Sequence, residues 1–234
     1  MNNKKLSGLF YTAVMGVAVL SLGSCTEKKF NINGTITQAK DSVLYLENMS
    51  LNGPKAVDSV KLDENGNFEF KQKAPDAPEF YRLRIANQMV NLAVDSTESI
   101  TVKAAYPTMS ANYEVSGSEE CAKIRDLAYM QLALQRQVTA IANSPTLGVQ
   151  AVEDSVTKVL EVYKNKVKLN YIFKEPMKAY SYYALFQTIV LGNANILIFN
   201  PRSSKDDVKV FAAVATSWDT YFPKAERGLN LHNI

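Results

Sequence analysis

The spacing of apolar residues changes once along the chain, near Ser118, and this change limits the folds that are possible. Residues 30–116 contain short runs in which apolar and polar residues alternate, as in half-buried β-strands. After Ser118 the apolar residues recur at spacings of three, four and seven, as in amphipathic helices. The sequence therefore predicts an α+β fold. An antiparallel β-sandwich or barrel-like domain over residues 30–116 precedes an all-helical domain of about four helices over residues 117–226, and residues 227–234 form a tail.

The β-rich half is divided by residues that favour turns. In residues 30–36 every second side chain is apolar or glycine, and Gly34 shares the apolar face. Residues 63–67 read Asp-Glu-Asn-Gly-Asn, and Asn-Gly favours the two positive φ angles of a type I′ hairpin turn. An EF-hand calcium loop would need Gly at its sixth position and Glu at its twelfth. Here Gly66 stands fourth and Ala74 twelfth, so the hairpin is the better interpretation.

The helical half is expected to begin at Ser118, whose hydroxyl suits a helix cap. Glu119 and Glu120 would then lie in the first turn, where the helix dipole favours negative charge. Gln131 interrupts the apolar stripe of this first helix, and an Asn-Ser-Pro sequence ends it near residue 143. The later helices are predicted over residues 149–173, 177–191 and 206–221.

The first residues are expected to direct the protein to its location rather than to fold with it. Residues 1–24 combine two lysines with a short apolar run, as a secretory signal peptide does. This run ends in Leu-Gly-Ser before Cys25, which resembles the bacterial lipobox. We therefore expect Cys25 to carry the lipid that attaches the protein to a membrane, with residues 25–29 as a tether. The alternatives are an ordinary signal peptide with a chance cysteine, and an N-terminal anchor helix.

The residues that follow the lipobox favour one location. Thr26 stands where an Asp would indicate retention in the inner membrane, and there is no acidic cluster of the kind that directs some lipoproteins to the cell surface. By analogy with bacterial lipoproteins that lack both signals, we expect a cell-envelope lipoprotein of the outer membrane that faces the periplasm. A net charge of +3 is too small to argue for nucleic acid as a partner.

Few side chains offer recognisable chemistry. The two cysteines, Cys25 and Cys121, cannot form a CxxC motif or a four-cysteine zinc site, and one histidine excludes a multi-histidine metal site. That histidine, His232, is the third residue from the end of the chain and is a poor candidate for a Ser-His-Asp triad. We assign no catalytic residue, no cofactor and no metal ligand.

Cys121 is the thiol that remains once Cys25 is acylated. The first turn of a helix lowers the pKa of a thiol, whereas the neighbouring Glu119 and Glu120 raise it. A free cysteine most often serves as a small buried hydrophobe, and that is our first interpretation. Thiol exchange with a partner protein is the alternative.

Two further patterns have a common structural explanation. The aromatic run at residues 180–186 could stack on sugars or bases, although aromatic residues at helical spacing more often form a core. Lys164, Lys166, Lys168 and Lys174 could face anionic lipid, although a solvated helix face is commoner.

Four stretches resemble a known β domain of unassigned function. They are FNINGTI, SVLYLEN, VDSVKLDENGNFEF and EFYRLRI, which follow one another between Phe30 and about Ala104. This domain is found at the N-terminus of periplasmic thiol:disulfide interchange lipoproteins, where a helical region and then a thioredoxin-like domain follow. The resemblance extends through SWDTYFPKA at residues 217–225. The thioredoxin-like domain and its CxxC site are missing here, so none of the redox residues of that family can be placed on this sequence.

The resemblance and the lipobox together imply a lipid-anchored accessory protein without a redox site of its own. Its two domains would act as a module that docks a protein partner or forms a homodimer. The chain would then have lost its catalytic domain, or be a fragment of a full thiol:disulfide oxidoreductase. The alternatives from other classes are thiol exchange through Cys121 and a peptide- or glycan-binding module.

Overall fold

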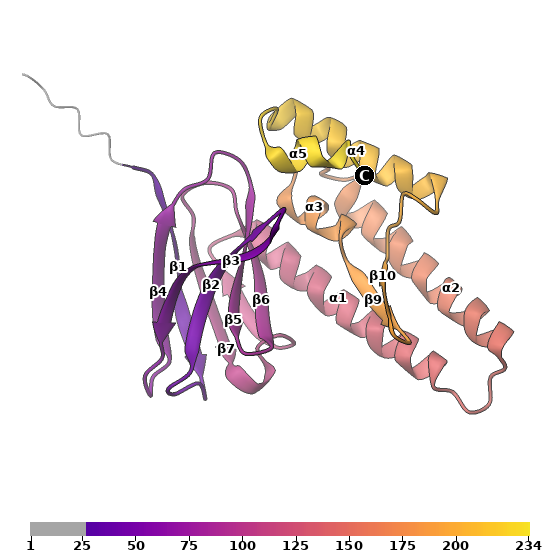
Figure 1. Ribbon diagram of the computed structural model, residues 1–234, viewed down its shortest axis with the longest axis horizontal. Helices are drawn as coiled ribbons and strands as arrows, with labels where there is room; N and C mark the ends of the chain where they lie inside the picture. Colours follow the sequence, from indigo (N-terminus) through magenta and orange to yellow (C-terminus); the bar gives the residue numbers. More distant parts are fainter. Residues whose placement is uncertain (1–26) are drawn as a thin grey trace, which may run out of the picture.

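The computed structural model describes residues 27–234, which form a β-sandwich and a helical region that lie side by side (Figure 1). Within this range the sandwich has a first sheet of order β4-β1-β7-β8 and a second sheet of order β3-β2-β5-β6. Its strands are β1 (Lys29–Thr37), β2 (Val43–Ser50), β3 (Gly53–Lys61), β4 (Asn67–Lys73), β5 (Glu79–Ile85), β6 (Gln88–Val94), β7 (Ser99–Ala105) and β8 (Tyr113–Ser116). The predicted α+β fold is confirmed, and the sheets of this part of the chain do not close into a barrel.

The two sheets pack face to face through the alternate positions that the sequence marked as apolar. Ile32 and Ile100 of the first sheet and Leu46 and Leu83 of the second sheet are completely buried between them. The opposite face of the second sheet also contributes to a core, because Phe80 packs among the helices. The second sheet therefore separates the interior of the sandwich from the helical region. One pairing departs from the antiparallel prediction, since β1 and β7 run parallel.

Residues 63–67 do not form the predicted type I′ hairpin turn. They lead from β3 in the second sheet to β4 in the first, where β4 pairs with β1. Gly66 has a φ of +69°, whereas Asn65 keeps a negative φ. The Asp63 carboxylate accepts hydrogen bonds from the N–H groups of Asn65 and Gly66, both at 2.9 Å. This Asx turn reverses the chain locally, and the sheet that each flanking strand joins is decided by packing at long range.

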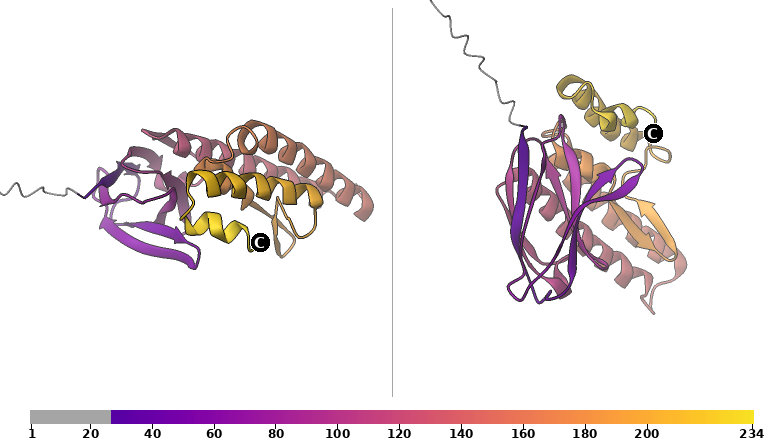
Figure 2. Two further views of the ribbon diagram at one scale, coloured as in Figure 1. Left: turned by 90° about the horizontal axis from the view of Figure 1, so that it is seen from above. Right: turned by 60° about the vertical axis from the view of Figure 1, so that its left-hand side comes forward.

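The helical region begins as the sequence predicted. Ser118 caps α1, because its hydroxyl oxygen accepts a hydrogen bond from the N–H of Cys121 at 3.2 Å. α2 runs back along α1, and α4 and α5 lie across the end of this pair that is nearer the sandwich (Figures 1 and 2). The helices are α1 (Glu119–Ala142), α2 (Val149–Val167) with a π-helical continuation η2 (Lys168–Ile172), α3 (Ala179–Leu185), α4 (Lys205–Tyr221) and α5 (Glu226–Leu231). None of the helices between residues 27 and 234 has the length and hydropathy needed to cross a bilayer.

The third predicted helix ends early, at Leu185, and a β-hairpin follows it. β9 (Thr188–Leu191) pairs with β10 (Ala194–Leu197) around Gly192, which has a φ of +60°. Three consecutive β-branched residues at the start of β9 favour the strand. The domain predicted as all-helical therefore contains a small sheet.

Two glutamines of α1 hold this hairpin against the helix. The Gln131 amide donates a hydrogen bond to the main-chain oxygen of Thr188 at 2.6 Å. Gln135 donates to the oxygen of Val190 at 2.9 Å and accepts from its N–H at 2.7 Å. The polar residue that interrupts the apolar stripe of α1 thus pairs with the open edge of β9, which would otherwise present unpaired backbone groups.

The predicted tail at residues 227–234 is folded for most of its length. α5 packs against α4, where Gly228 lies against the completely buried side chain of Trp218. Arg227 and Leu231 of the same helix are also buried. The end of this range is therefore part of the helical core.

Candidate functional site

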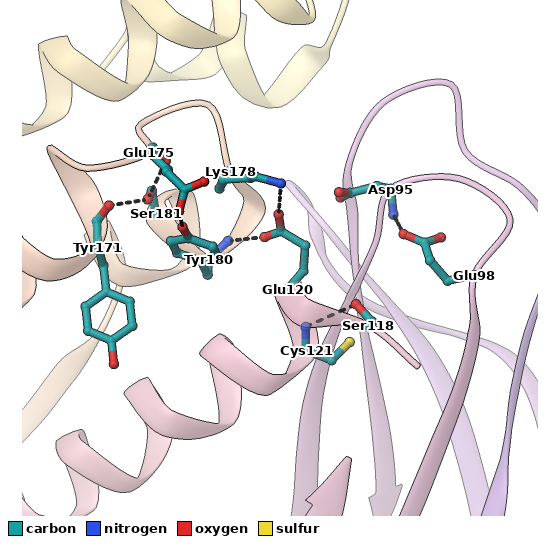
Figure 3. A network of polar contacts seen from close by, with 10 residues as sticks. All are labelled: Asp95, Glu98, Ser118, Glu120, Cys121, Tyr171, Glu175, Lys178, Tyr180 and Ser181. Carbon is teal, nitrogen blue, oxygen red and sulfur yellow. Dashed lines mark hydrogen bonds and ion pairs between the residues drawn. The ribbon is translucent and has the colours of Figure 1, made fainter. Parts of the chain in front are cut away.

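The junction between sandwich and helices contains a buried polar network that fixes the start of α3 (Figure 3). Glu120, in the first turn of α1, accepts a hydrogen bond from the N–H of Tyr180 at 3.0 Å and pairs with the Lys178 ammonium at 3.2 Å. Burial raises the pKa of Glu120 even though both partners favour its ionised form. Glu120 therefore caps α3 from a different helix, a role that the sequence did not predict for it.

A second layer of the same network holds α3 from the side of η2. The hydroxyl of Ser181 donates to the main-chain oxygens of Glu175 at 2.9 Å and Tyr171 at 3.2 Å. The Tyr180 hydroxyl donates to the Glu175 carboxylate. These bonds fix the first turn of α3 at the junction. The residues that follow in α3 include Tyr182 and Tyr183.

Asp95, in the loop from β6 to β7, faces this network from the sandwich (Figure 3). Burial raises its pKa to about 7, and the negative charges of Glu120 and Glu98 add to the shift, which Lys178 opposes. Its Oδ1 has no hydrogen-bond partner among the described residues. The loop itself is held by Glu98, whose carboxylate accepts from the Asp95 N–H at 2.8 Å. The charges of Glu120, Glu98 and Lys178 thus all act on Asp95 where the sandwich joins the helices.

Asp95→Asn should stabilise the protein at pH 8 and have little effect near pH 4. The pKa of Asp95 rises from 3.8 to about 7 on folding, so the folded state binds the proton more tightly than the unfolded state does. The contribution of Asp95 to stability is therefore complete below about pH 3.8 and is lost as the pH rises through about 7. Because Asp95 is partly solvated, the full free energy of this pKa shift is not expected. We expect the free energy of unfolding of Asp95→Asn to be higher by roughly 1 to 3 kcal/mol at pH 8.

Urea denaturation of Asp95→Asn and of the unsubstituted protein at pH 4 and pH 8 measures the difference in their stability. Asp76→Asn is the matched control, because Asp76 is an exposed residue of the same sandwich and a surface substitution changes stability by less than about 0.5 kcal/mol. Equal stability of Asp95→Asn and the unsubstituted protein at pH 8 would contradict the raised pKa of Asp95.

The structure places the second predicted site residue, Cys121, in the sandwich core. Its side chain is completely buried, and its Sγ donates a hydrogen bond to the main-chain oxygen of Ala93 at 3.2 Å. Burial raises the pKa of the Cys121 thiol to about 12, which outweighs the bond from its own N–H to Ser118 and its place at the start of α1. The contacts favour the interpretation of Cys121 as a small buried hydrophobe. Cys25 lies outside the described residues.

Cys121 is expected to resist alkylation in the folded protein. A thiol with a pKa of about 12 holds about a thousandth of the thiolate, at pH 8, of one with the ordinary value of 9. We expect iodoacetamide to label Cys121 at least a hundredfold more slowly in buffer than in 8 M urea. Mass spectrometry of the peptide that contains Cys121 measures both rates. Equal rates in the two solvents would show that the thiol is accessible in the native state.

A groove of about 680 Å³ lies between the outer face of the second sheet and the helical region. One wall comes from β5 and β6 with the turn between β2 and β3, and the other from α3, α5 and the start of β9. Its volume falls in the usual range for ligand sites. The described residues that line it are Met49, Ser50, Leu51, Phe80, Tyr81, Arg82, Met89, Asn91, Leu92, Gln131, Tyr182, Tyr183, Phe186, Gln187, Thr188, Arg227 and Asn230.

The aromatic run of α3 supplies one side of the groove. The ring of Tyr182 stacks on Phe80 of the sandwich at 5.5 Å between centroids and packs at a tilt against Trp218 at 4.8 Å. Tyr183 is half-buried, and its hydroxyl accepts a hydrogen bond from the Asn91 amide of β6 at 3.3 Å. Phe186 is exposed at the rim. The core interpretation of this run therefore holds for Tyr182, whereas the later residues of the run reach the groove surface.

Arg227 lines the groove and joins α5 to the sandwich. Its guanidinium donates to the Glu79 carboxylate, with Nη2 at 2.7 Å and Nε at 3.2 Å, and also to the main-chain oxygen of Met49. It also lies over the rings of Phe80, at 4.9 Å, and Tyr182, at 5.9 Å. Sequence reasoning missed this residue, because it assigned residue 227 to a tail.

A second charged cluster borders the groove on the outer face of the second sheet. Arg82 and Arg84 both donate to the buried Glu47 carboxylate, each through Nε at 2.7 Å. Burial opposes the ionisation of Glu47, but these bonds outweigh it and lower its pKa. One carboxylate is thus shared by two guanidinium groups, which leaves a surplus of positive charge on this face.

Other residues that the sequence singled out lie apart from this groove. Lys164 does not belong to a solvated lysine face, because it pairs with the buried Asp207 at 2.6 Å, whereas Lys166 and Lys174 are exposed. His232 contacts Asp219 on the surface at 2.9 Å. Within residues 27–234 no three His, Cys, Asp or Glu side chains gather closely enough to hold a metal ion.

Comparison with known families assigns the sandwich but not a function. Residues 30–123 match the family described as Domain of unknown function (DUF4369). The match covers both sheets and the first turn of α1, and it ends just past Cys121. No curated protein matches the chain. The domain of unknown function expected from the sequence is therefore present.

Proposed function

We propose that the chain is a lipid-anchored docking module of the bacterial cell envelope, which holds a protein partner in the groove between its sandwich and its helices. The observation that carries this proposal is the groove itself. It combines the exposed aromatic side chain of Phe186 with methionine side chains from β2 and β6. It also carries more positive charge from arginine than negative charge from carboxylates. Such a mixture of adaptable apolar residues and arginine is typical of surfaces that bind proteins.

The lipobox at Cys25 supports the envelope location. A diacylated cysteine would hold the module at a membrane, and by the analogy drawn from Thr26 this membrane would be the outer one, with the module on the periplasmic side. The family match over residues 30–123 covers the β domain on which the resemblance to thiol:disulfide interchange lipoproteins rests. In that lineage the module would position a redox enzyme.

Docking is a better interpretation than thiol exchange because Cys121 is completely buried. A thiol that attacks a partner disulfide must be reachable and ionised, and Cys121 is buried with a raised pKa. The groove, in contrast, is open to solvent and is lined from both halves of the molecule.

Site-specific photo-crosslinking in the native host tests the docking part. Benzoylphenylalanine at Leu51 or at Phe186 should give an adduct with one and the same protein, identified by mass spectrometry. Benzoylphenylalanine at Phe173, an exposed aromatic position outside the groove lining, is the matched control and should not give that adduct. Failure of both groove positions to yield a shared adduct would refute docking at this groove.

Fractionation tests the anchor separately. The unsubstituted protein should partition with membranes and take up radioactive palmitate, and Cys25→Ser should do neither. Membrane partition of Cys25→Ser equal to that of the unsubstituted protein would contradict lipid attachment at Cys25.

A further inference from the structure

The groove presents apolar side chains from three separate elements. Leu51 in the turn between β2 and β3 is 44% exposed, Met89 of β6 is 37% exposed, and Phe186 after α3 is 36% exposed. All three line the same groove. Large apolar side chains that converge on one concavity indicate an apolar occupant, whereas isolated exposed residues of this kind do not.

The aromatic faces in the groove are largely engaged by other protein groups. Phe186 packs against Tyr182 at 5.0 Å and against Phe211 at 5.8 Å, and Phe80 contacts both Tyr182 and Arg227. A sugar ring needs a free flat aromatic face on which to stack. The flexible side chains of Met49 and Met89 instead suit side chains of varied shape, as in peptide-binding surfaces.

The charged residues of the groove add a preference for negative charge. Arg82 and Arg227 line the groove, and none of its described lining residues is acidic. Arg227 is neutralised by Glu79, but Arg82 shares the Glu47 carboxylate with Arg84. A guanidinium has five N–H donors, and Glu47 engages Arg82 through Nε and Nη2. A carboxylate brought by the occupant would complement the surplus charge beside the apolar rim.

We propose that the groove binds an extended peptide segment of a protein partner in which a large apolar side chain stands next to an acidic one. The apolar side chain lies among Leu51, Met89 and Phe186, and the carboxylate lies at Arg82. The amide side chains of Asn91 and Asn230, which line the same groove, can both donate to and accept from a peptide backbone. This inference rests on the proposed docking function and specifies what is docked.

Selection from a peptide library tests the proposal. The full-length protein in detergent is incubated with terminally blocked hexapeptides randomised at every position, and the bound peptides are sequenced. We expect enrichment of Phe, Leu or Met next to Asp or Glu. For a selected peptide, titration calorimetry should show binding that weakens in 0.5 M NaCl. Replacing its acidic residue by the matching amide should lower the affinity about tenfold.

Matched variants locate the binding site. Phe186→Ser and Leu51→Ser should each lower the affinity for the selected peptide at least fivefold, and Phe173→Ser, at an exposed phenylalanine outside the groove lining, should not. Arg82→Gln should abolish the preference for the acidic peptide over its amide form. Arg202→Gln removes the same charge from an exposed loop and should leave that preference intact. Circular dichroism confirms that each variant is folded.

Several outcomes would overturn the proposal. Enrichment of apolar residues without acidic neighbours, or binding that survives both Phe186→Ser and Leu51→Ser, would do so. So would binding of oligosaccharides at the groove, or a concentration-dependent dimer that Phe186→Ser disrupts. If no peptide is enriched but crosslinks from Leu51 and Phe186 still reach one partner, the docking function stands and the peptide inference fails. If the crosslinks also fail, both fail.

Discussion

Gly34→Ala is expected to lower the free energy of unfolding by at least about 3 kcal/mol, and Gly34→Val to prevent folding. Gly34 lies in the middle of β1 with a φ of +151°, in the region that L-residues rarely adopt. A Cβ there would stand 1.8 Å from the main-chain oxygen of Val102, its neighbour on β7. This neighbour is backbone of a central strand, so the clash can be relieved only by separating β1 from β7. Urea denaturation followed by circular dichroism measures the loss.

Gly53→Ala separates the effect of the clash from that of the φ angle. Gly53 has a φ of +109°, but a Cβ there would meet no atom within 4 Å. Its substitution should therefore cost only the backbone strain, about 1 kcal/mol. If Gly34→Ala proved no worse than Gly53→Ala, the close approach of β1 to β7 would not be a determinant of the fold.

The period of the apolar residues was sufficient to predict the two halves of the molecule. Alternation in residues 30–116 reflects a sandwich in which every second side chain is buried, and the cap at Ser118 marks a true helix start. The same alternation placed Gly34 on the apolar face but gave no reason for a glycine there. That reason is a backbone contact between strands that are separated by more than sixty residues.

Local signals failed where pairing at long range decides the structure. Asn-Gly at residues 65 and 66 marked a reversal, yet the strands on either side join different sheets. Residues 188–191 were placed in a helix, but Gln131 and Gln135 of α1 offer their side-chain amides to the backbone of a strand. A glutamine on a helix carries no sequence signal of such a role, because its partner is more than fifty residues away.

The candidate site was the least predictable part. Cys121 attracted attention as a thiol, and its burial depends on the contact of α1 with β6, which the sequence does not reveal. The groove residues come from at least five elements, so each alone resembles an ordinary core or surface residue. Arg227 illustrates this, since its pairing with Glu79 spans 148 residues and requires both halves to be placed first. The aromatic run was recognised, but only the fold shows which of its rings lie at the surface.

Trp218→Ala is expected to lower the free energy of unfolding by about 3 to 5 kcal/mol, the usual cost of removing a buried aromatic side chain. Trp218 of α4 is completely buried, and its ring contacts Tyr182 at 4.8 Å and Phe222 at 5.3 Å. Gly228 of α5 also packs against it, where an added Cβ would stand 3.2 Å from the Cβ of Trp218. The substitution would therefore open a cavity shared by α3, α4 and α5, the helices that form and support one wall of the groove.

Trp218→Phe is the matched control, because it keeps an aromatic ring in the same place. The indole Nε1 of Trp218 is buried and has no hydrogen-bond partner among residues 27–234, so its removal relieves a desolvation cost that offsets part of the lost packing. We expect a loss of less than about 2 kcal/mol for this variant. Because Tyr182 loses its support only in Trp218→Ala, that variant should also bind a selected peptide more weakly at a urea concentration where both variants remain folded. Equal destabilisation by the two substitutions would show that a phenyl ring at position 218 packs no better than a methyl group, and would contradict the stabilising role of ring packing proposed for Trp218.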